Sequence, residues 1–189
     1  MSRNVLITGG SRGVGAEAVR AFRRAGDNVV FTYHKSELEA DEIRQETGAV
    51  PVRCDMKFSN SVKIAVDKAL SVLGTVDVLI CAASINDLSD VTDIDETRWE
   101  EVIDTNLNGV FFSIKYVLPV MISRRSGNIM ALSPEWGEVE QDCGTAVAAS
   151  RAGVRGLMQS LTGEVTKYGI GVKCITASDI AEIVGKSTL

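Results

Sequence analysis

The architecture of this chain is set by the stretch Val5-Leu6-Ile7-Thr8-Gly9-Gly10-Ser11-Arg12-Gly13-Val14-Gly15, an apolar run followed by a glycine-rich turn and the opening of a helical segment. Glycines in such a turn let the backbone approach a pyrophosphate closely, and the helix that follows presents free N–H groups and the positive end of its dipole. We therefore predict a dinucleotide-binding turn, although a tight turn without a ligand has the same pattern. The residues predicted to contact the cofactor here are Gly9, Ser11, Arg12, Gly13, Val14 and Gly15.

Short apolar runs alternate with helical segments along the chain, and such runs are typical of strands buried on both faces. The runs are residues 5–7, 29–31, 50–52, 76–80, 128–132 and 172–175. Helical spacing predicts helices from a capping box at Ser36-Glu37-Leu38-Glu39, from Asp95, over about residues 109–124 and over about residues 145–168. The alternation predicts an α/β fold, a Rossmann-like doubly wound parallel sheet with strand order 3-2-1-4-5-6, in a single dinucleotide-binding domain over residues 1–189.

Composition argues against several classes of protein. The 189 residues include 20 Lys and Arg against 25 Asp and Glu, a net charge of −5, whereas nucleic-acid binders usually present a basic stripe. No apolar run approaches the roughly 20 residues of a membrane span, and Met1 stands too close to the first run for a secretory leader. The four cysteines lie far apart without a C-x-x-C pair, and there is one histidine, so neither a zinc site nor a disulfide framework is expected. We expect a cytoplasmic protein with reduced thiols and with no metal, nucleic-acid or membrane partner.

The pattern Thr8-Gly9-x-x-x-Gly13-x-Gly15 resembles the cofactor motif of the short-chain dehydrogenase/reductase family, and the likeness extends to about residue 180. Trp99 and the stretch Val102–Gly109 resemble the family's "W…N-L-x-G" segment, in which Asn106 matches the catalytic asparagine. Bacterial 3-oxoacyl-acyl-carrier-protein reductases are the subgroup that the chain most resembles. The resemblance implies a nicotinamide cofactor.

The end of the second predicted strand indicates which cofactor. An NAD-selective site needs a carboxylate there for the ribose hydroxyls, but the chain reads Thr32-Tyr33-His34-Lys35. Lys35 and Arg12, with His34 as an addition, suit the 2′-phosphate of NADP, although solvated surface charges have the same appearance. We predict NADP rather than NAD. The resemblance adds Asp55, at the family's adenine-contacting position, and Ala82 to the predicted cofactor contacts.

The family's catalytic side chains are missing at their matched positions. The serine falls on Pro134, the tyrosine on Val147 and the lysine on Arg151, while Ser133 stands one residue early. Proline and valine carry no side-chain donor or acceptor. An arginine stays charged and cannot be tuned as a lysine is, though it could still contact ribose or phosphate. Losing a positioned acid or base removes about 10²–10⁴ in rate.

We therefore predict a degenerate family member that binds NADP(H) weakly and has little or no redox activity alone, with a cofactor-sensing or partner-binding role. Asn106 remains without its catalytic partners, and an asparagine that serves the backbone at a helix kink is the preferred interpretation. The alternative is an active NADPH-dependent carbonyl or 3-oxoacyl reductase. A purely structural subunit without cofactor is a third class.

Other tyrosine–lysine pairs stand too far away to substitute. Tyr168, next to Lys167, lies about 30 Å beyond Val147 along one predicted helix. Tyr116, next to Lys115, lies about 15 Å beyond Asn106. Polar side chains closer to the cleft in sequence remain as alternatives, and these are Glu135, Glu138, Asp142 and Cys143.

The resemblance also implies assembly through the helices that begin near Gly109 and Thr145. The second of these helices is rich in small residues, which let two helices approach closely, although they could instead pack on this chain's own sheet. The family's seventh strand and its helix have no counterpart before Leu189, and a sheet that ends at strand six would expose an unpaired edge. We predict a homodimer, or a heterodimer with a complete relative, rather than a tetramer.

Overall fold

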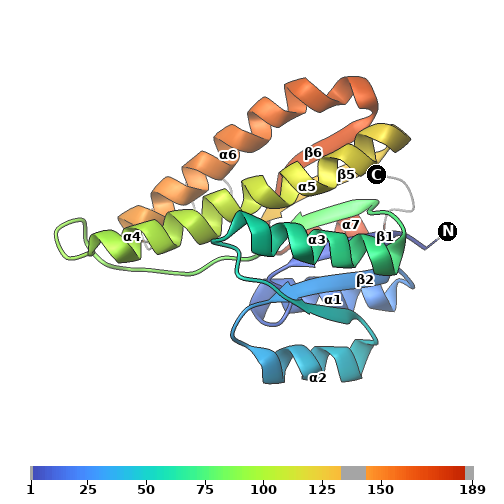
Figure 1. Cartoon of the computed structure of the whole chain (residues 1–189), viewed down its shortest axis with the longest axis horizontal. Coiled ribbons are helices and arrows are strands. Elements are labelled where there is room, and N and C mark those ends of the chain that lie inside the picture. The colour runs from blue at the N-terminus through green and yellow to red at the C-terminus, as the bar shows by residue number, and fades with distance from the viewer. Residues whose placement is uncertain (1, 133–143, 186–189) are drawn as a thin grey trace.

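A computed structural model describes residues 2–132 and 144–185, in which six parallel strands form one sheet in the order β3-β2-β1-β4-β5-β6 (Figure 1). The strand bounds are β1 (Asn4–Thr8), β2 (Asn28–Tyr33), β3 (Val50–Arg53), β4 (Val78–Cys81), β5 (Gly127–Leu132) and β6 (Ile170–Ile175). Each strand starts within two residues of an apolar run identified in the sequence. The predicted Rossmann-like sheet and its strand order are therefore confirmed.

Strand β1 is central, and its neighbours define the register. Leu6 pairs with Val30 of β2 on one side and with Leu79 of β4 on the other. All four residues of β4, and all of β1 except Asn4, are buried. Apolar side chains on both faces explain why these runs are continuous in hydrophobicity rather than alternating.

Helices cover both faces of the sheet (Figure 1). Their bounds are α1 (Gly13–Arg24), α2 (Glu37–Thr47), α3 (Ser59–Leu73), α4 (Glu96–Ile103), α5 (Gly109–Arg124), α6 (Thr145–Val165) and α7 (Asp179–Gly185), with short turns η1 (Asp104–Asn108) and η2 (Thr166–Tyr168). None of the helices found in these residues combines the length and the apolarity needed to cross a membrane.

The strands divide their side chains between two apolar cores. Val5 and Ile7 of β1 point into the layer that holds α1, α2 and α7. Leu6 points into the opposite layer, where α3, α5 and α6 pack. Because successive side chains of a strand face opposite sides, one short run serves both layers.

Two local features differ from the sequence expectation. Helix α2 begins at Glu37 as predicted, but Ser36 has φ −88° and ψ 64° and makes no capping hydrogen bond with its side chain, so the capping box does not form. The sequence predicts separate helices from Asp95 and over about residues 109–124, whereas the structure joins them through η1, a single π-helical turn that runs continuously into both. Asp95 does cap α4, since its side chain accepts a hydrogen bond from the Arg98 N–H at 2.9 Å.

Candidate functional site

A cavity of about 820 Å³ opens at the carboxyl ends of the strands. It is lined by the segments that follow β1, β2, β3, β4 and β6, together with η1 and α6. The chain leaves β1 toward β2 and leaves β4 toward β5, on the opposite side, so the cavity lies at the switch point of a doubly wound sheet. Its volume is in the usual range for a cofactor or small-molecule site.

The turn after β1 passes very close to the segment after β4. Gly9 has φ +70°, and a Cβ atom on it would stand 2.6 Å from the Cα atom of Ala83. A Cβ atom on Gly15 would collide with the carbonyl oxygen of Gly9. Only glycine fits at these two positions, so the glycine spacing has a steric cause that is independent of any ligand.

Two threonine hydroxyls hold this turn in place. The Thr8 Oγ1 atom accepts hydrogen bonds from the N–H groups of Ala82 and Ala83 at 3.1 and 3.2 Å. The Thr32 Oγ1 atom accepts from the Gly9 N–H at 3.1 Å. This role of Thr32 was not predicted, because a threonine at the end of a strand carries no local signal of the group that its hydroxyl will bind.

The start of α1 is open to an anion. Gly13 has φ +52°, and a Cβ atom on it would meet no atom within 4 Å. Arg12 stands at the N-cap without a side-chain capping bond, and the first turn contains no acidic residue. The free N–H groups and the positive dipole end therefore face unfilled space lined by Ser11 and Val14, a cradle that fits a pyrophosphate.

Charged groups gather around the cavity beyond this cradle. His34, Lys35 and Asp55 line it, and so does Ala82. The His34 Nε2 atom lies 3.4 Å from the Asp55 Oδ2 atom. The Asp55 Oδ1 atom also accepts from the Lys57 N–H at 3.1 Å. The structure thus brings the residues predicted for the 2′-phosphate and adenosine into one region.

Asn106 uses its amide to hold the backbone. Its Oδ1 atom accepts from the Ile85 N–H at 2.8 Å, and its Nδ2 atom donates to the Ile85 carbonyl at 3.0 Å. The same Nδ2 atom lies 3.3 Å from Ser150 Oγ, and Ser150 Oγ donates to the Val147 carbonyl at 2.8 Å. The Asn106 side chain therefore ties η1 to the segment after β4 and to α6.

The matched catalytic positions on α6 form an apolar wall with one cation. Val147 is buried in a small cluster with Val102 and Ala146. Arg151 lines the cavity and is half-buried. The other positions considered in the sequence analysis lie outside the described residues, and these are Ser133, Pro134, Glu135, Glu138, Asp142 and Cys143.

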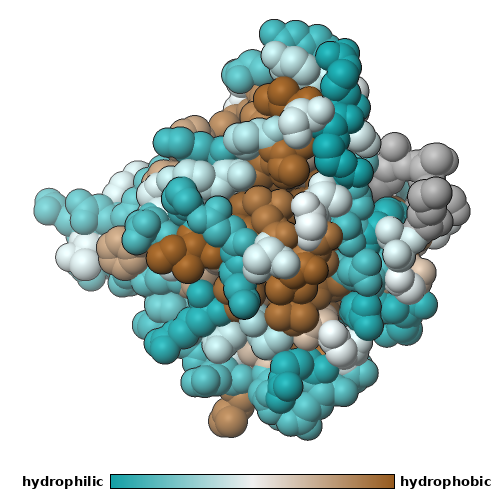
Figure 2. Space-filling model, turned by 45° about the vertical axis from the view of Figure 1, so that its right-hand side comes forward, coloured by the Kyte–Doolittle hydropathy of each residue, from teal (hydrophilic) through white to brown (hydrophobic). Residues whose placement is uncertain are grey.

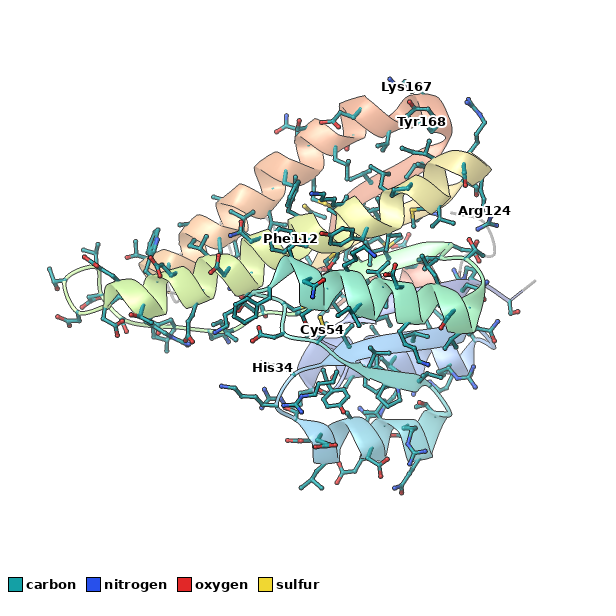
Figure 3. All side chains as sticks on the ribbon, viewed as in Figure 1. His34, Cys54, Phe112, Arg124, Lys167 and Tyr168 are labelled. Carbon is teal, nitrogen blue, oxygen red and sulfur yellow. The ribbon has the colours of Figure 1, made fainter. Side chains whose placement is uncertain are left out.

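The distant tyrosines do not reach the cavity. Figure 3 shows Lys167 and Tyr168 together at the far end of α6, well away from His34. The Lys167 Nζ atom lies 5.2 Å from the centre of the Tyr168 ring. The Tyr116 hydroxyl lies 2.6 Å from the Ser59 Oγ atom, on the outer side of α3 and α5. Neither tyrosine is among the described residues that line the cavity.

The described cysteines are poor nucleophiles. Cys81, at the end of β4, borders the cavity but is 3% exposed, and burial raises its pKa to about 12. Burial also raises the pKa of Cys54 and of Cys174. Residues 2–132 and 144–185 contain no group of three or more His, Cys, Asp or Glu side chains that could hold a metal ion.

Comparisons of the sequence and of the fold with known proteins all find short-chain dehydrogenases, reductases or oxidoreductases. A model of the short chain dehydrogenase family matches residues 3–184. The 3-oxoacyl-[acyl-carrier-protein] reductase FabG of Staphylococcus aureus is 32% identical over 180 residues, which cover 93% of this chain and 73% of the reductase. Oxidoreductase UcpA of Salmonella typhimurium is 36% identical over 177 residues, 92% of this chain and 67% of its own. The crystal structure of a metagenomic short-chain oxidoreductase in complex with NADP superimposes with a TM-score of 0.84 at 26% identity, covering 96% of this chain and 88% of that one.

We predict that Cys81 resists alkylation in the native protein. With a pKa near 12, about one Cys81 thiol in 10⁴ is ionised at pH 8, and the thiolate is the reactive form. Iodoacetamide labelling followed by peptide mass spectrometry should find Cys81 modified far more slowly than the half-buried Cys174, with the difference abolished in guanidinium. Because the thiolate fraction rises tenfold per pH unit below the pKa, labelling of Cys81 should accelerate steeply toward pH 10. Equal rates for both cysteines at pH 8 would contradict the prediction.

Proposed function

Because this chain belongs to the short-chain dehydrogenase family, we propose that it binds NADP(H) in the cavity but performs little or no redox chemistry alone. The observation that carries the proposal is the contrast between the two parts of the cavity. The phosphate cradle is complete, whereas the described positions matched to the catalytic tyrosine and lysine are Val147 and Arg151. A role in sensing the cofactor or in binding a partner follows from this contrast.

The chain's own residues support binding of the phosphorylated cofactor. The open start of α1 suits the pyrophosphate, and Arg12 and Lys35 supply positive charge where a 2′-phosphate would lie, with His34 beside them. The similar metagenomic oxidoreductase was crystallised with NADP. A bound nicotinamide cofactor supplies hydride, while the protein must supply orientation and the proton.

Of the contributions that the protein must make to hydride transfer, the supply of a proton is the one that its residues lack. Hydride addition to a carbonyl leaves negative charge on oxygen, so the reaction needs a donor and a stabilising hydrogen bond at that atom. Val147 provides neither, and Arg151 remains charged without an acidic proton to transfer at neutral pH. Loss of the acid removes about 10²–10⁴ in rate, and loss of an oxygen-stabilising donor removes about 10²–10³ more.

We predict that Gly13→Asp abolishes cofactor binding. The new carboxylate would enter the open space at the start of α1 and repel the pyrophosphate, so the Kd for NADPH should rise at least 100-fold in calorimetry. Gly26→Asp is a matched control, because Gly26 has φ +86° and open space around it at the opposite end of α1. Unaltered NADPH affinity in Gly13→Asp, or an equal loss in both variants, would show that the turn is not the site.

We predict that chemistry returns only when several positions change together. The wild type should consume little or no NADPH with a panel of ketones and 3-oxoacyl thioesters, after trace reductases have been removed. Pro134→Ser, Val147→Tyr and Arg151→Lys combined should raise the rate by roughly 10² or more, whereas Val147→Tyr alone should not, because the matched serine and lysine would still be absent. Turnover by the wild type would instead support the active reductase, and full rates from Val147→Tyr alone would refute our account of the inactivity.

We further propose that two copies of the chain pair through α5 and α6. Figure 2 shows hydrophobic side chains gathered in a band across one face of the molecule, between hydrophilic margins. Phe111 of α5 is 44% exposed. On α6, Ala152 and Gly156 face outward, and a Cβ atom on Gly156 would meet no atom of this chain within 4 Å. Exposed small residues one helical turn apart allow close contact with a second helix.

We predict a particle of twice the 20.3 kDa chain mass in light scattering at micromolar concentration. Gly156→Arg should shift the population to monomer, because the long charged side chain would stand at the closest approach of the paired helices. Leu38→Arg serves as control, since Leu38 is 80% exposed on α2, on the other face of the sheet. A monomeric or tetrameric wild type would refute the pairing.

A further inference from the structure

His34 and Asp55 form a titratable pair at the end of the cavity where adenosine is predicted to lie. The neighbouring strands β2 and β3 end there, and the Cys54 N–H donates a hydrogen bond to the Tyr33 carbonyl at 2.7 Å between them. The His34 Nε2 atom lies 3.4 Å from the Asp55 Oδ2 atom, and both residues line the cavity. The imidazole is 40% exposed, so a ligand in the cavity can reach it.

The carboxylate of Asp55 is held in place by its own neighbours. Its Oδ1 atom accepts a hydrogen bond from the Lys57 N–H at 3.1 Å, and the Asp55 N–H donates to the Ser61 Oγ atom at 2.9 Å. A fixed carboxylate beside Nε2 favours a proton on that nitrogen of His34. Nδ1 is then the ring nitrogen that remains for a ligand, and it carries a lone pair in the neutral ring and an N–H group in the protonated ring.

Charged groups surround the pair from each neighbouring segment. Arg12 lines this end of the cavity from the turn after β1, Lys35 from the segment after β2 and Lys57 from the segment after β3. The Lys57 ammonium is engaged by Glu101 at 3.1 Å, and the first turn of α2 adds the exposed Glu37. Arginine, lysine and glutamate ordinarily keep their charges between about pH 5 and pH 8, whereas histidine is the side chain whose charge ordinarily changes there.

The two nicotinamide cofactors present different chemical groups at this point. NAD has a ribose 2′-hydroxyl, which can donate a hydrogen bond to a neutral imidazole nitrogen. NADP has a 2′-phosphate, whose ionised oxygens accept hydrogen bonds and are repelled by a lone pair. A protonated imidazole instead gives this phosphate a charge-assisted hydrogen bond. The same histidine therefore suits NAD when it is neutral and NADP when it is protonated.

We propose that the protonation of His34 tunes the choice between NADP and NAD, with Asp55 fixing the ring so that Nδ1 meets the 2′ position. The inference rests on the proposed function, because it requires a nicotinamide cofactor in the cavity. Arg12 and Lys35 maintain a preference for NADP throughout, and protonation of His34 increases that preference as the pH falls. Binding of NADP⁺ is in turn coupled to the uptake of a proton, whereas binding of NAD⁺ is not.

Calorimetry with NADP⁺ and NAD⁺ at about pH 6 and pH 8.5 tests the proposal. The quantity compared is the preference, Kd for NAD⁺ divided by Kd for NADP⁺. Between the higher and the lower pH, the preference of the wild type should rise roughly fivefold or more relative to the same change in His34→Gln. His34→Arg, which is charged at both pH values, should keep a high preference at both. The 2′-phosphate itself titrates near pH 6, but it does so with every variant, so the comparison among variants isolates His34.

Two further variants separate charge from positioning. Lys35→Gln is the matched control, because it removes a neighbouring charge that does not titrate in this range. Its preference for NADP⁺ should fall at both pH values and keep its dependence on pH. Asp55→Asn should move the rise in preference to lower pH, because the protonated ring loses its carboxylate. Both cofactors contain the adenine that Asp55 is predicted to contact, so the ratio cancels any loss of that contact.

Proton NMR supplies a second readout, because the chain has one histidine and its ring signals can be followed directly in protein freed of any affinity tag. Saturating NADP⁺ should move the midpoint of the His34 titration upward by about 0.7 pH unit, the change that linkage requires for a fivefold gain in affinity. NAD⁺ should not move it upward. An unchanged midpoint with NADP⁺, or an equal upward movement with both cofactors, would overturn the proposal.

The outcomes also distinguish this inference from the proposed function. Binding of NADP⁺ with a preference that follows His34→Gln at both pH values would overturn the role of His34 and leave the proposed function standing. If neither cofactor binds at any pH, the proposed function is refuted and the inference with it.

Discussion

The close approach between the turn after β1 and the segment after β4 is the constraint on which the site depends. Gly9 comes within contact distance of Ala83, and the Thr8 hydroxyl joins the same two segments. This contact holds the start of α1 at the switch point of the sheet and aims its free N–H groups into the cavity. The cradle is thus part of the sheet's own framework, so it can persist whether or not the chain retains redox chemistry.

Most of the fold could be predicted because its signals are local. Continuous apolar runs, a glycine spacing with a steric cause, and a parallel sheet's handedness rules lead to the observed strand order. The π-helical turn η1 could not be predicted, because it depends on hydrogen bonds from Asn106 to Ile85, 21 residues away. At Ser36 the local sequence pattern was only partly informative. It predicted where α2 starts, but not the backbone angles of Ser36, which leave its side chain without the capping hydrogen bond.

The candidate site likewise has residues that could be predicted from the local sequence and residues that could not. The cradle residues are neighbours in sequence, and their role follows from the turn that they form. The partners of Asn106 come from two distant elements, and Ser150 stands in a helix where nothing in the local pattern marks it. An asparagine that holds both η1 and α6 has a structural role that does not require the family's catalytic tyrosine and lysine. Its presence in this sequence is therefore weak support for catalysis.

The two sides of the cavity present positive charge by different physical means, and this difference has consequences for their tolerance to change. The cradle uses backbone N–H groups and a helix dipole, which do not depend on the identity of any one side chain. The α6 side has one guanidinium, that of Arg151, whose buried Nη1 atom has no hydrogen-bond partner among residues 2–132 and 144–185. Groups that destabilise a fold are characteristic of functional sites, where a ligand compensates for the cost. Arg151 therefore differs from Val147, although both stand at positions matched to catalytic side chains of the family: the valine packs into a small buried cluster, whereas the arginine keeps a charged group at the wall of the cavity.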